Sequence, residues 1–371
     1  AEAGEVNENG TIDIVDALMI AQYYVGLISQ FPCSPTPAPT SVQTHPHTQA
    51  PTPESTAVPM PQGYLTPVFI DRPFKVSSTF WNTRVKNIIV NWIPWCYNQL
   101  SNTNIAEGGI ENFVQAGRKI DGLSYSAHAG YWFSPAYVLN TFESICVALM
   151  VDPQGDSAII SAQNAMRTKM ADWLPKILSA QENDGYFATW HTLGGYTRWD
   201  PAHRDAHEGY VAGYWIEAGI AHYLATGETP FYESAKRLAD CWYNNAPGRG
   251  GWWDGHQEME QACTRLGRFV NLVEGGGRGD RYIDLAKTLM DVRRGGGTYD
   301  QSHDYPVNQR EAVGHSVRAV YLYAAMTDVA MLLNDASYTT AANALWDNIT
   351  NRKLYVTGGV GSGETSEGFG P

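Results

Sequence analysis

The chain has 371 residues, and its 25 Lys and Arg against 38 Asp and Glu give a formal net charge of −13. This acidic balance argues against a nucleic-acid-binding protein, which needs a basic surface to displace counterions from phosphates. No apolar run approaches the roughly 18 residues of a membrane span, so we predict no membrane-embedded segment. The 12 Trp and 21 Tyr residues predict either a large core or a cleft in which sugar rings stack on aromatic faces.

Residues 1–30 combine an acidic loop with a short amphipathic helix. Residues 5–16 read EVNENGTIDIVD, which places oxygen atoms at the spacing of an EF-hand calcium loop. Gly10 takes the sixth position, where such a loop turns sharply, whereas the first position is Glu instead of the usual Asp. The alternative is an acidic turn that only caps the helix. The predicted Ca²⁺ ligands are Glu5, Asn7, Asn9, Thr11 (through its carbonyl), Asp13 and Asp16.

Residues 31–63 contain nine of the 20 prolines together with many Thr and Ser. Such a composition cannot bury a core and favours extended chain, so it predicts a linker. Residues 64–371 are long enough for one large globular domain. Because the chain starts at Ala1 without a signal peptide and stops at Pro371 in a Gly-rich stretch, we expect a piece of a longer protein.

The 64–371 zone carries apolar residues at helical spacing, and it predicts an almost entirely helical domain. Helices that follow one another with short connections predict helix pairs stacked around an axis; the alternative is an irregular bundle. The best strand candidate is KLYVTGGV at 353–360. The predicted helices lie near residues 88–101, 135–151, 156–180, 206–226, 230–244, 255–272, 280–293, 310–333 and 337–351.

Three of these helices open with a histidine: His207, His256 and His315, spaced 49 and 59 residues apart. Two helices and their loops fill such an interval, so equivalent positions in successive pairs predict three imidazoles around one polar cup. One alternative is that each is a satisfied core histidine. Another is a three-histidine metal site. The metal site is disfavoured because His203 and His207, although four residues apart, straddle a predicted helix start at Asp205.

The five cysteines, Cys33, Cys96, Cys146, Cys241 and Cys263, lie far apart and form no Cys-x-x-Cys motif. This spacing predicts neither a zinc knuckle nor a thioredoxin-type site. An odd and sparse set also argues against a disulfide scaffold. Cys146, Cys241 and Cys263 fall within helical patterns and are expected to be small core residues.

With the helix IVDALMIAQYYVGL attached, the N-terminal loop resembles one repeat of a dockerin. Dockerins carry two such calcium-binding repeats and attach bacterial polysaccharide-degrading enzymes to cohesin modules. Residues 1–30 are therefore expected to be half of a dockerin, with Ca²⁺ as its cofactor and a cohesin as its partner.

The large domain contains a series of recognisable stretches, in order: TFWNTRVKNIIVNWIP, AQENDGYF, DAHEGYVAGYWIEAGIAHYLATG, DGHQEMEQA, GDRYIDLAKTL, EAVGHSVRAVYLYAAMTDVA, LWDNITNRKLYVTGGVGS and SEGFG. Through them, the run from Phe74 to Pro371 is similar to glycoside hydrolase family 127, the β-L-arabinofuranosidase-like family. The resemblance implies an all-α (α/α)6 barrel, followed in complete members by β-rich modules that this chain is expected to lack.

The resemblance also implies roles for individual residues. His207, His256 and His315 match the sugar-binding imidazoles, and Glu367 matches the general acid/base, with Glu364 as the fallback because gaps could shift the alignment. Family members use a cysteine nucleophile held by Zn²⁺, with a glutamate and further cysteines as ligands. None of the five cysteines here matches, so the nucleophile and the zinc ligands are expected beyond Pro371, and this chain is expected to be inactive alone.

Three hypotheses follow for the function. The first is a secreted retaining glycosidase that removes L-arabinofuranose from plant polysaccharides or glycoproteins. The second is another enzyme on the (α/α)6 frame, an unsaturated-uronide hydrolase or a polysaccharide lyase, with Asp205, Glu208 or Glu258 as key carboxylates. The third is a non-catalytic module that binds glycans or docks on a cohesin.

Overall fold

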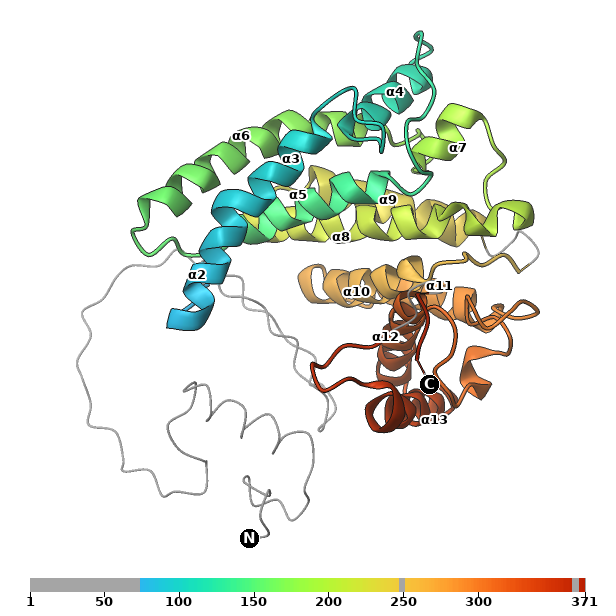
Figure 1. Ribbon diagram of the computed structural model, residues 1–371. Coiled ribbons are helices and arrows are strands. Elements are labelled where there is room, and N and C mark those ends of the chain that lie inside the picture. Colours follow the sequence, from blue (N-terminus) through green and yellow to red (C-terminus); the bar gives the residue numbers. More distant parts are fainter. Residues whose placement is uncertain (1–73, 247–250, 362–366, 371) are drawn as a thin grey trace, which may run out of the picture. The chain divides into compact units, whose positions relative to one another are not determined.

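The computed structural model describes residues 74–246, 251–361 and 367–370 (Figure 1). The predicted calcium loop, the helix after it, the linker and Glu364 lie outside these residues. The described residues are all-α, as predicted: they hold no strand, and two isolated bridges join Phe74 to Val151 and His315 to Gly368. None of their helices combines the length and the hydropathy that crossing a membrane requires.

Four inner helices succeed one another, and each is followed in the chain by an outer helix. Helix α8 packs on both α5 and α10, and α10 packs on α12, while the outer helix α9 packs on α6 and α11 (Figure 1). This alternation is the arrangement of an (α/α)6 barrel. The pairs are α5 (Pro135–Leu149) with α6 (Ser157–Ser179), α8 (Glu208–Thr226) with α9 (Pro230–Asn245), α10 (Glu258–Val273) with α11 (Asp280–Asp291), and α12 (Ser316–Leu332) with α13 (Ala336–Asn348).

The first helical run is longer than predicted. It comprises α2 (Thr79–Asn87), the π-helical turn η1 (Ile88–Trp92) and α3 (Ile93–Leu100). Pro94 explains the wider turn, because proline donates no hydrogen bond and its ring collides with the carbonyl four residues earlier. Two short helices were not predicted, α4 (Ile110–Ile120) and α7 (Thr189–Gly194).

Several other boundaries differ from the sequence prediction. Helix α12 begins at Ser316 instead of near 310, because η3 (Pro306–Asn308) and a loop precede it. The strand predicted at 353–360 is wrong. That segment follows the π-helical turn η4 (Ile349–Lys353) and closes on itself, since the Tyr355 N–H donates to the Gly359 carbonyl (2.9 Å).

Glycines mark the closest approaches between neighbouring helices. A Cβ atom on Gly213 of α8 would lie 2.5 Å from Cγ of Glu258 on α10, and one on Gly267 of α10 would lie 2.5 Å from Cγ1 of Ile283 on α11. Both distances are below van der Waals contact, so a side chain would force these helices apart. The fully buried Trp173, Trp215 and Trp242 show that much of the aromatic content serves the core.

Candidate functional site

The three predicted histidines come together at the N-terminal ends of α8, α10 and α12. The ring centroids of His207 and His256 are 5.5 Å apart, and those of His256 and His315 are 6.0 Å apart. Each residue lies one or two positions before the first residue of its helix. Because the three histidines occupy equivalent positions in successive helix pairs, their imidazoles lie in one row. This is the arrangement predicted for a shared sugar-binding cup. Their role in sugar binding stays a prediction.

Glu367 lies directly against this row. Its Oε2 is 2.9 Å from Nε2 of His315, while Nδ1 of His315 accepts the N–H groups of Val317 and Arg318 at the start of α12. Because Nδ1 is an acceptor, the proton of the neutral ring lies on Nε2 and is donated to the Glu367 carboxylate. The carbonyl of Glu367 accepts the Ser316 N–H (3.0 Å), which anchors the segment to the same helix.

His207 is held in an uncommon backbone conformation. Its φ of 56° lies in the left-handed region, and Glu367 has a similar φ of 52°. Nε1 of Trp132 donates to Nδ1 of His207 (3.0 Å), yet the Asp205 carbonyl oxygen is 2.6 Å from the same nitrogen. The two contacts require opposite tautomers, so Nε2 can face a ligand as a donor or as an acceptor. Such strained positions are characteristic of functional sites.

All three imidazoles are neutral at pH 7. Burial lowers the pKa of His207 to about 4 and holds the pKa of His256 well below its usual value. Burial and the nearby Arg318 guanidinium also lower the pKa of His315, against the opposing effect of Glu367. A neutral imidazole offers one donor and one acceptor, which suits sugar hydroxyls. A metal ion needs ligand atoms within about 2.1 Å, and the described residues contain no group of three or more His, Cys, Asp or Glu that could hold one.

Aromatic side chains surround the imidazole row, and sequence reasoning had not assigned them individually. The ring of Tyr210 is 4.4 Å from that of His256, Phe133 is 5.1 Å from His207, and Tyr299 is 5.4 Å from His315. The hydroxyls of Tyr214 and Tyr321 form a hydrogen bond beside them. The only sequence signal was the general aromatic surplus. Part of that surplus therefore does line the candidate site.

Asp254 is a further residue that sequence reasoning missed. Its Oδ2 accepts the N–H groups of Gly209 and Tyr210 (3.2 Å) in the first turn of α8, and its Oδ1 accepts the His256 N–H (2.9 Å). One buried carboxyl thereby links the start of α8, just after His207, to the segment that carries His256. Burial is the main cause that raises its pKa to about 7. Asp254 positions two imidazoles without belonging to either helix.

The carboxylates of the alternative enzyme hypothesis do not form one reactive group. Glu208 and Glu258 are both 1% exposed, whereas the Asp205 side chain is 81% exposed. Glu208 accepts the Tyr186 hydroxyl (2.6 Å) and the Trp199 N–H (2.9 Å to Oε2), so its two oxygens hold the preceding loop. Burial holds the pKa of Glu258 well above its usual range, which disfavours the ionised form of this carboxyl.

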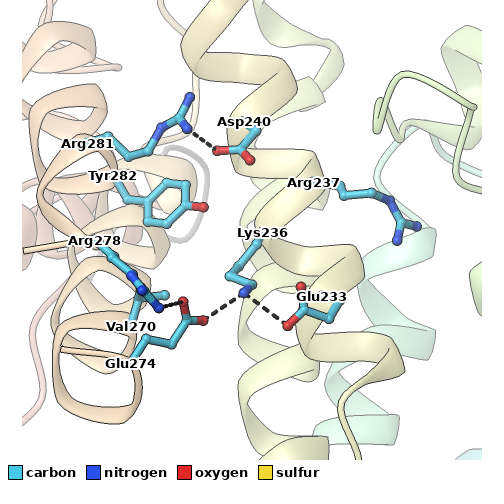
Figure 2. A pocket seen from close by; sticks show the side chains of 9 residues that line it. All are labelled: Glu233, Lys236, Arg237, Asp240, Val270, Glu274, Arg278, Arg281 and Tyr282. Atoms are coloured by element: carbon cyan, nitrogen blue, oxygen red, sulfur yellow. Dashed lines mark hydrogen bonds and ion pairs between the residues drawn. The ribbon is translucent and has the colours of Figure 1, made fainter. Parts of the chain in front are cut away.

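A hollow of about 330 Å³, away from the imidazole row, is lined by residues of α9, α11 and the end of α10 (Figure 2). Its charged side chains have a structural role. Lys236 bridges Glu233 (2.9 Å) and Glu274 (2.6 Å), while Arg281 pairs with Asp240 (3.3 Å). Arg281 and Asp240 join the outer helices α9 and α11, whereas Lys236 and Glu274 join α9 to the C-terminal end of α10. Six of the seven charged side chains that line the hollow are paired within it and the seventh, Arg237, bonds to Gln181, so the cluster serves to tie helices together.

The described cysteines do not approach the imidazole row as ligands or nucleophiles. Cys146, Cys241 and Cys263 are buried, as predicted, and Cys96 is half-buried. Burial raises the pKa of each thiol, which keeps it protonated and unreactive.

Helix pairs around an axis, with a neutral imidazole row and a carboxylate at the helix N-termini, define an (α/α)6-barrel domain of the type found in glycoside hydrolases. The family model for the GH127 β-L-arabinofuranosidase catalytic domain matches residues 74–371. The chain therefore belongs to the GH127 β-L-arabinofuranosidase catalytic-domain family.

Individual relatives agree with this assignment. A non-reducing end β-L-arabinofuranosidase of Bifidobacterium longum is 27% identical over 342 residues, covering 79% of this chain and 49% of the relative. The crystal structure of a GH127 β-L-arabinofuranosidase from Geobacillus stearothermophilus T6 matches with a TM-score of 0.66 and 27% identity, over 79% of this chain and 47% of the other. A GH127 β-arabinofuranosidase structure matches with a TM-score of 0.66 and 32% identity, over 80% and 45%. The chain spans about half the length of these relatives.

Proposed function

We propose that the protein is a glycoside hydrolase that removes a terminal β-L-arabinofuranose residue from a glycan. The observation that carries the proposal is the row His207–His256–His315 with Glu367 at its end, in a chain of the GH127 family. We infer the identity of the sugar from the names of two relatives, which are β-L-arabinofuranosidases. A secreted protein that acts on arabinose-containing plant glycans is the setting we propose, with the N-terminal half dockerin, its Ca²⁺ loop and a cohesin partner as a further part of the same proposal.

In this proposal the imidazoles bind the sugar and Glu367 transfers the proton. Neutral rings at the three helix N-termini exchange hydrogen bonds with the furanose hydroxyls, and the buried His256 sits in the middle of the row. Glu367, with a side chain that is 69% exposed, can reach a leaving oxygen at the mouth of the cup. For this step Glu367 carries a proton, which it gives to that oxygen as the acid, and the carboxylate left behind then accepts a proton from water as the base. The nucleophile that forms the glycosyl–enzyme bond in a retaining enzyme is expected outside the described residues.

A zinc-bound cysteine nucleophile is part of the mechanism expected for the family. The described residues do not fit it, because they contain no metal-binding group of His, Cys, Asp or Glu and their thiols are protonated by burial. If such a centre takes part in the reaction, its ligands lie outside the described residues. The proposal for this chain therefore rests on sugar binding and on the acid alone.

The test is calorimetric titration of the 371-residue chain with methyl β-L-arabinofuranoside. We expect binding in the wild type and at least a tenfold loss in His256→Ala, since a buried hydrogen-bonding partner of the sugar is worth about 1.4 kcal/mol or more. Tyr243→Ala, an exposed residue of the outer helix α9, is the matched control. No heat of binding in the wild type, or equal affinity in His256→Ala, would remove the basis of the proposal. Hydrolysis of an aryl β-L-arabinofuranoside by this chain alone would refute the expected need for further residues.

A further inference from the structure

A string of aromatic rings leads away from the imidazole row toward solvent. The Trp132 ring, which already donates a hydrogen bond to His207, lies 6.5 Å from the ring of Trp190. Trp190 in turn stacks on Tyr196, with centroids 4.0 Å apart and an interplanar angle of 21°. His256 is 5% exposed, Trp132 37% and Tyr196 42%, while Trp190 between Trp132 and Tyr196 is partly buried. The string is therefore continuous with the cup and open at its outer end.

The backbone at the end of α7 brings the Tyr196 ring against Trp190. Helix α7 ends at Gly194, and the φ of 68° at its C-cap Gly195 reverses the backbone. The N–H groups of Gly195 and Tyr196 both donate to the His191 carbonyl. A Cβ atom on Gly194 would lie 2.1 Å from the Tyr196 ring, so only glycine permits the ring to fold back over the helix end. Two glycines together thus bring Tyr196 onto Trp190.

A polar group accompanies the stacked pair. The His203 ring meets Trp190 edge-on at 5.7 Å and Tyr196 at 5.5 Å. Its Nδ1 is buried 3.9 Å from an Asp200 carboxylate oxygen, while 36% of the His203 side chain remains exposed. An aromatic face beside a hydrogen-bonding imidazole repeats the chemistry of the cup. Tyr196 keeps 42% of its surface exposed although Trp190 covers one face of its ring.

We propose that Tyr196, backed by Trp190 and flanked by His203, is a second sugar-binding subsite that holds a residue of the glycan attached to the arabinofuranose in the cup. The ligand class is carbohydrate, because a sugar presents an apolar ring face for stacking and hydroxyls for an imidazole. Trp132 connects the two subsites. The inference rests on the proposed function and extends it, since it makes the chain selective for oligosaccharides over simple glycosides.

The experiment compares two ligands with the 371-residue chain: methyl β-L-arabinofuranoside and a trisaccharide ending in β-L-arabinofuranose. Calorimetry should show that the wild type binds the trisaccharide about tenfold more tightly, a difference of about 1.4 kcal/mol. Tyr196→Ala should abolish most of this preference, and Tyr196→Phe should keep it, because the ring makes the contact. Trp92→Ala is the matched control, since Trp92 is 60% exposed and stacks on Trp95 on the first helical run.

The outcomes separate the two proposals. Equal affinity for both ligands in the wild type, or a preference that survives Tyr196→Ala, would overturn the second subsite while leaving the proposed function intact. Failure of the wild type to bind either ligand would overturn both. A preference lost equally in Tyr196→Ala and Trp92→Ala would also overturn the subsite, because the effect would then not depend on this stack.

Discussion

Replacing Glu208 by Gln should make the stability of the protein less sensitive to alkaline pH. Glu208 is the first residue of α8, and burial is the main cause that raises the pKa of its carboxyl to about 8. Its Oε2 is 3.4 Å from Nε2 of His191, a ring that burial also keeps neutral by lowering its pKa to about 4. A protonated Glu208 can donate to that nitrogen while its other oxygen accepts from Tyr186. The Gln amide keeps the donation to His191 and the acceptance from Tyr186 without a titrating proton, and the Trp199 N–H then has only the remaining oxygen, at the Oε1 position (3.1 Å), as its acceptor.

The sign and size of the effect follow from the difference between the pKa of Glu208 in the folded protein, about 8, and its value of 4.5 in the unfolded chain. The folded protein keeps a proton that the unfolded chain releases near pH 4.5, so this contribution to stability is complete below pH 4.5 and is lost as the pH rises through 8. At 1.36 kcal/mol per pH unit, the interval sets a ceiling of roughly 5 kcal/mol. The wild type should therefore lose a few kcal/mol relative to Glu208→Gln between pH 5 and pH 8.5.

The assay is urea unfolding of both proteins at several pH values across this range, with the difference in unfolding free energy plotted against pH. Subtracting the unfolding free energy of one protein from that of the other cancels the contributions of groups that titrate identically in both. Asp347→Asn, at an exposed side chain of α13 for which the described residues show no ion pair, is the control and should give a flat difference. If the Glu208→Gln difference is also flat, Glu208 is ionised in the folded protein and the reasoning is wrong.

Three further predictions concern other parts of the domain. Asp254→Ala should lower the unfolding free energy by about 3 kcal/mol in urea denaturation, because it leaves three N–H groups, two of them buried and one partly buried, without their acceptor. A loss below about 0.5 kcal/mol would contradict this. Gly267→Ala should lower it by about 1–3 kcal/mol, since its Cβ would lie 2.5 Å from Ile283, although helix propensity alone favours Ala by about 1 kcal/mol; a higher melting temperature would refute the close packing. Glu367→Gln should lower the pKa of His315 in an NMR titration, because it removes the carboxylate 2.9 Å away; an unchanged pKa would show that the pair does not form in solution.

The agreement between sequence and structure is best where the pattern is local and periodic. Helices α8, α10 and α12 were placed by their apolar spacing, and the histidines that precede them were recognised by their repeated position. The π-helical turn η1 was not foreseen, because it depends on how the helix accommodates Pro94, and nothing in the sequence of η4 marks the second such turn. Helix α4 was missed although Ile110 and Phe113 recur at helical spacing, since its eleven residues give only a short signal.

The sequence by itself determined that the domain is all-α, that it belongs with the GH127 enzymes, and that His207, His256, His315 and Glu367 are the residues to examine. The helical class and the repeated histidines needed only helical periodicity, which local chemistry controls, whereas the family and Glu367 came from the resemblance of short motifs to GH127 enzymes. Only the tertiary structure decided that Glu367 meets His315, that Asp254 links two of the histidine segments, and that the Trp132–Trp190–Tyr196 string opens from the cup. Each of these contacts joins residues from different helices or loops, so their spacing along the chain carries no information about the distance between them.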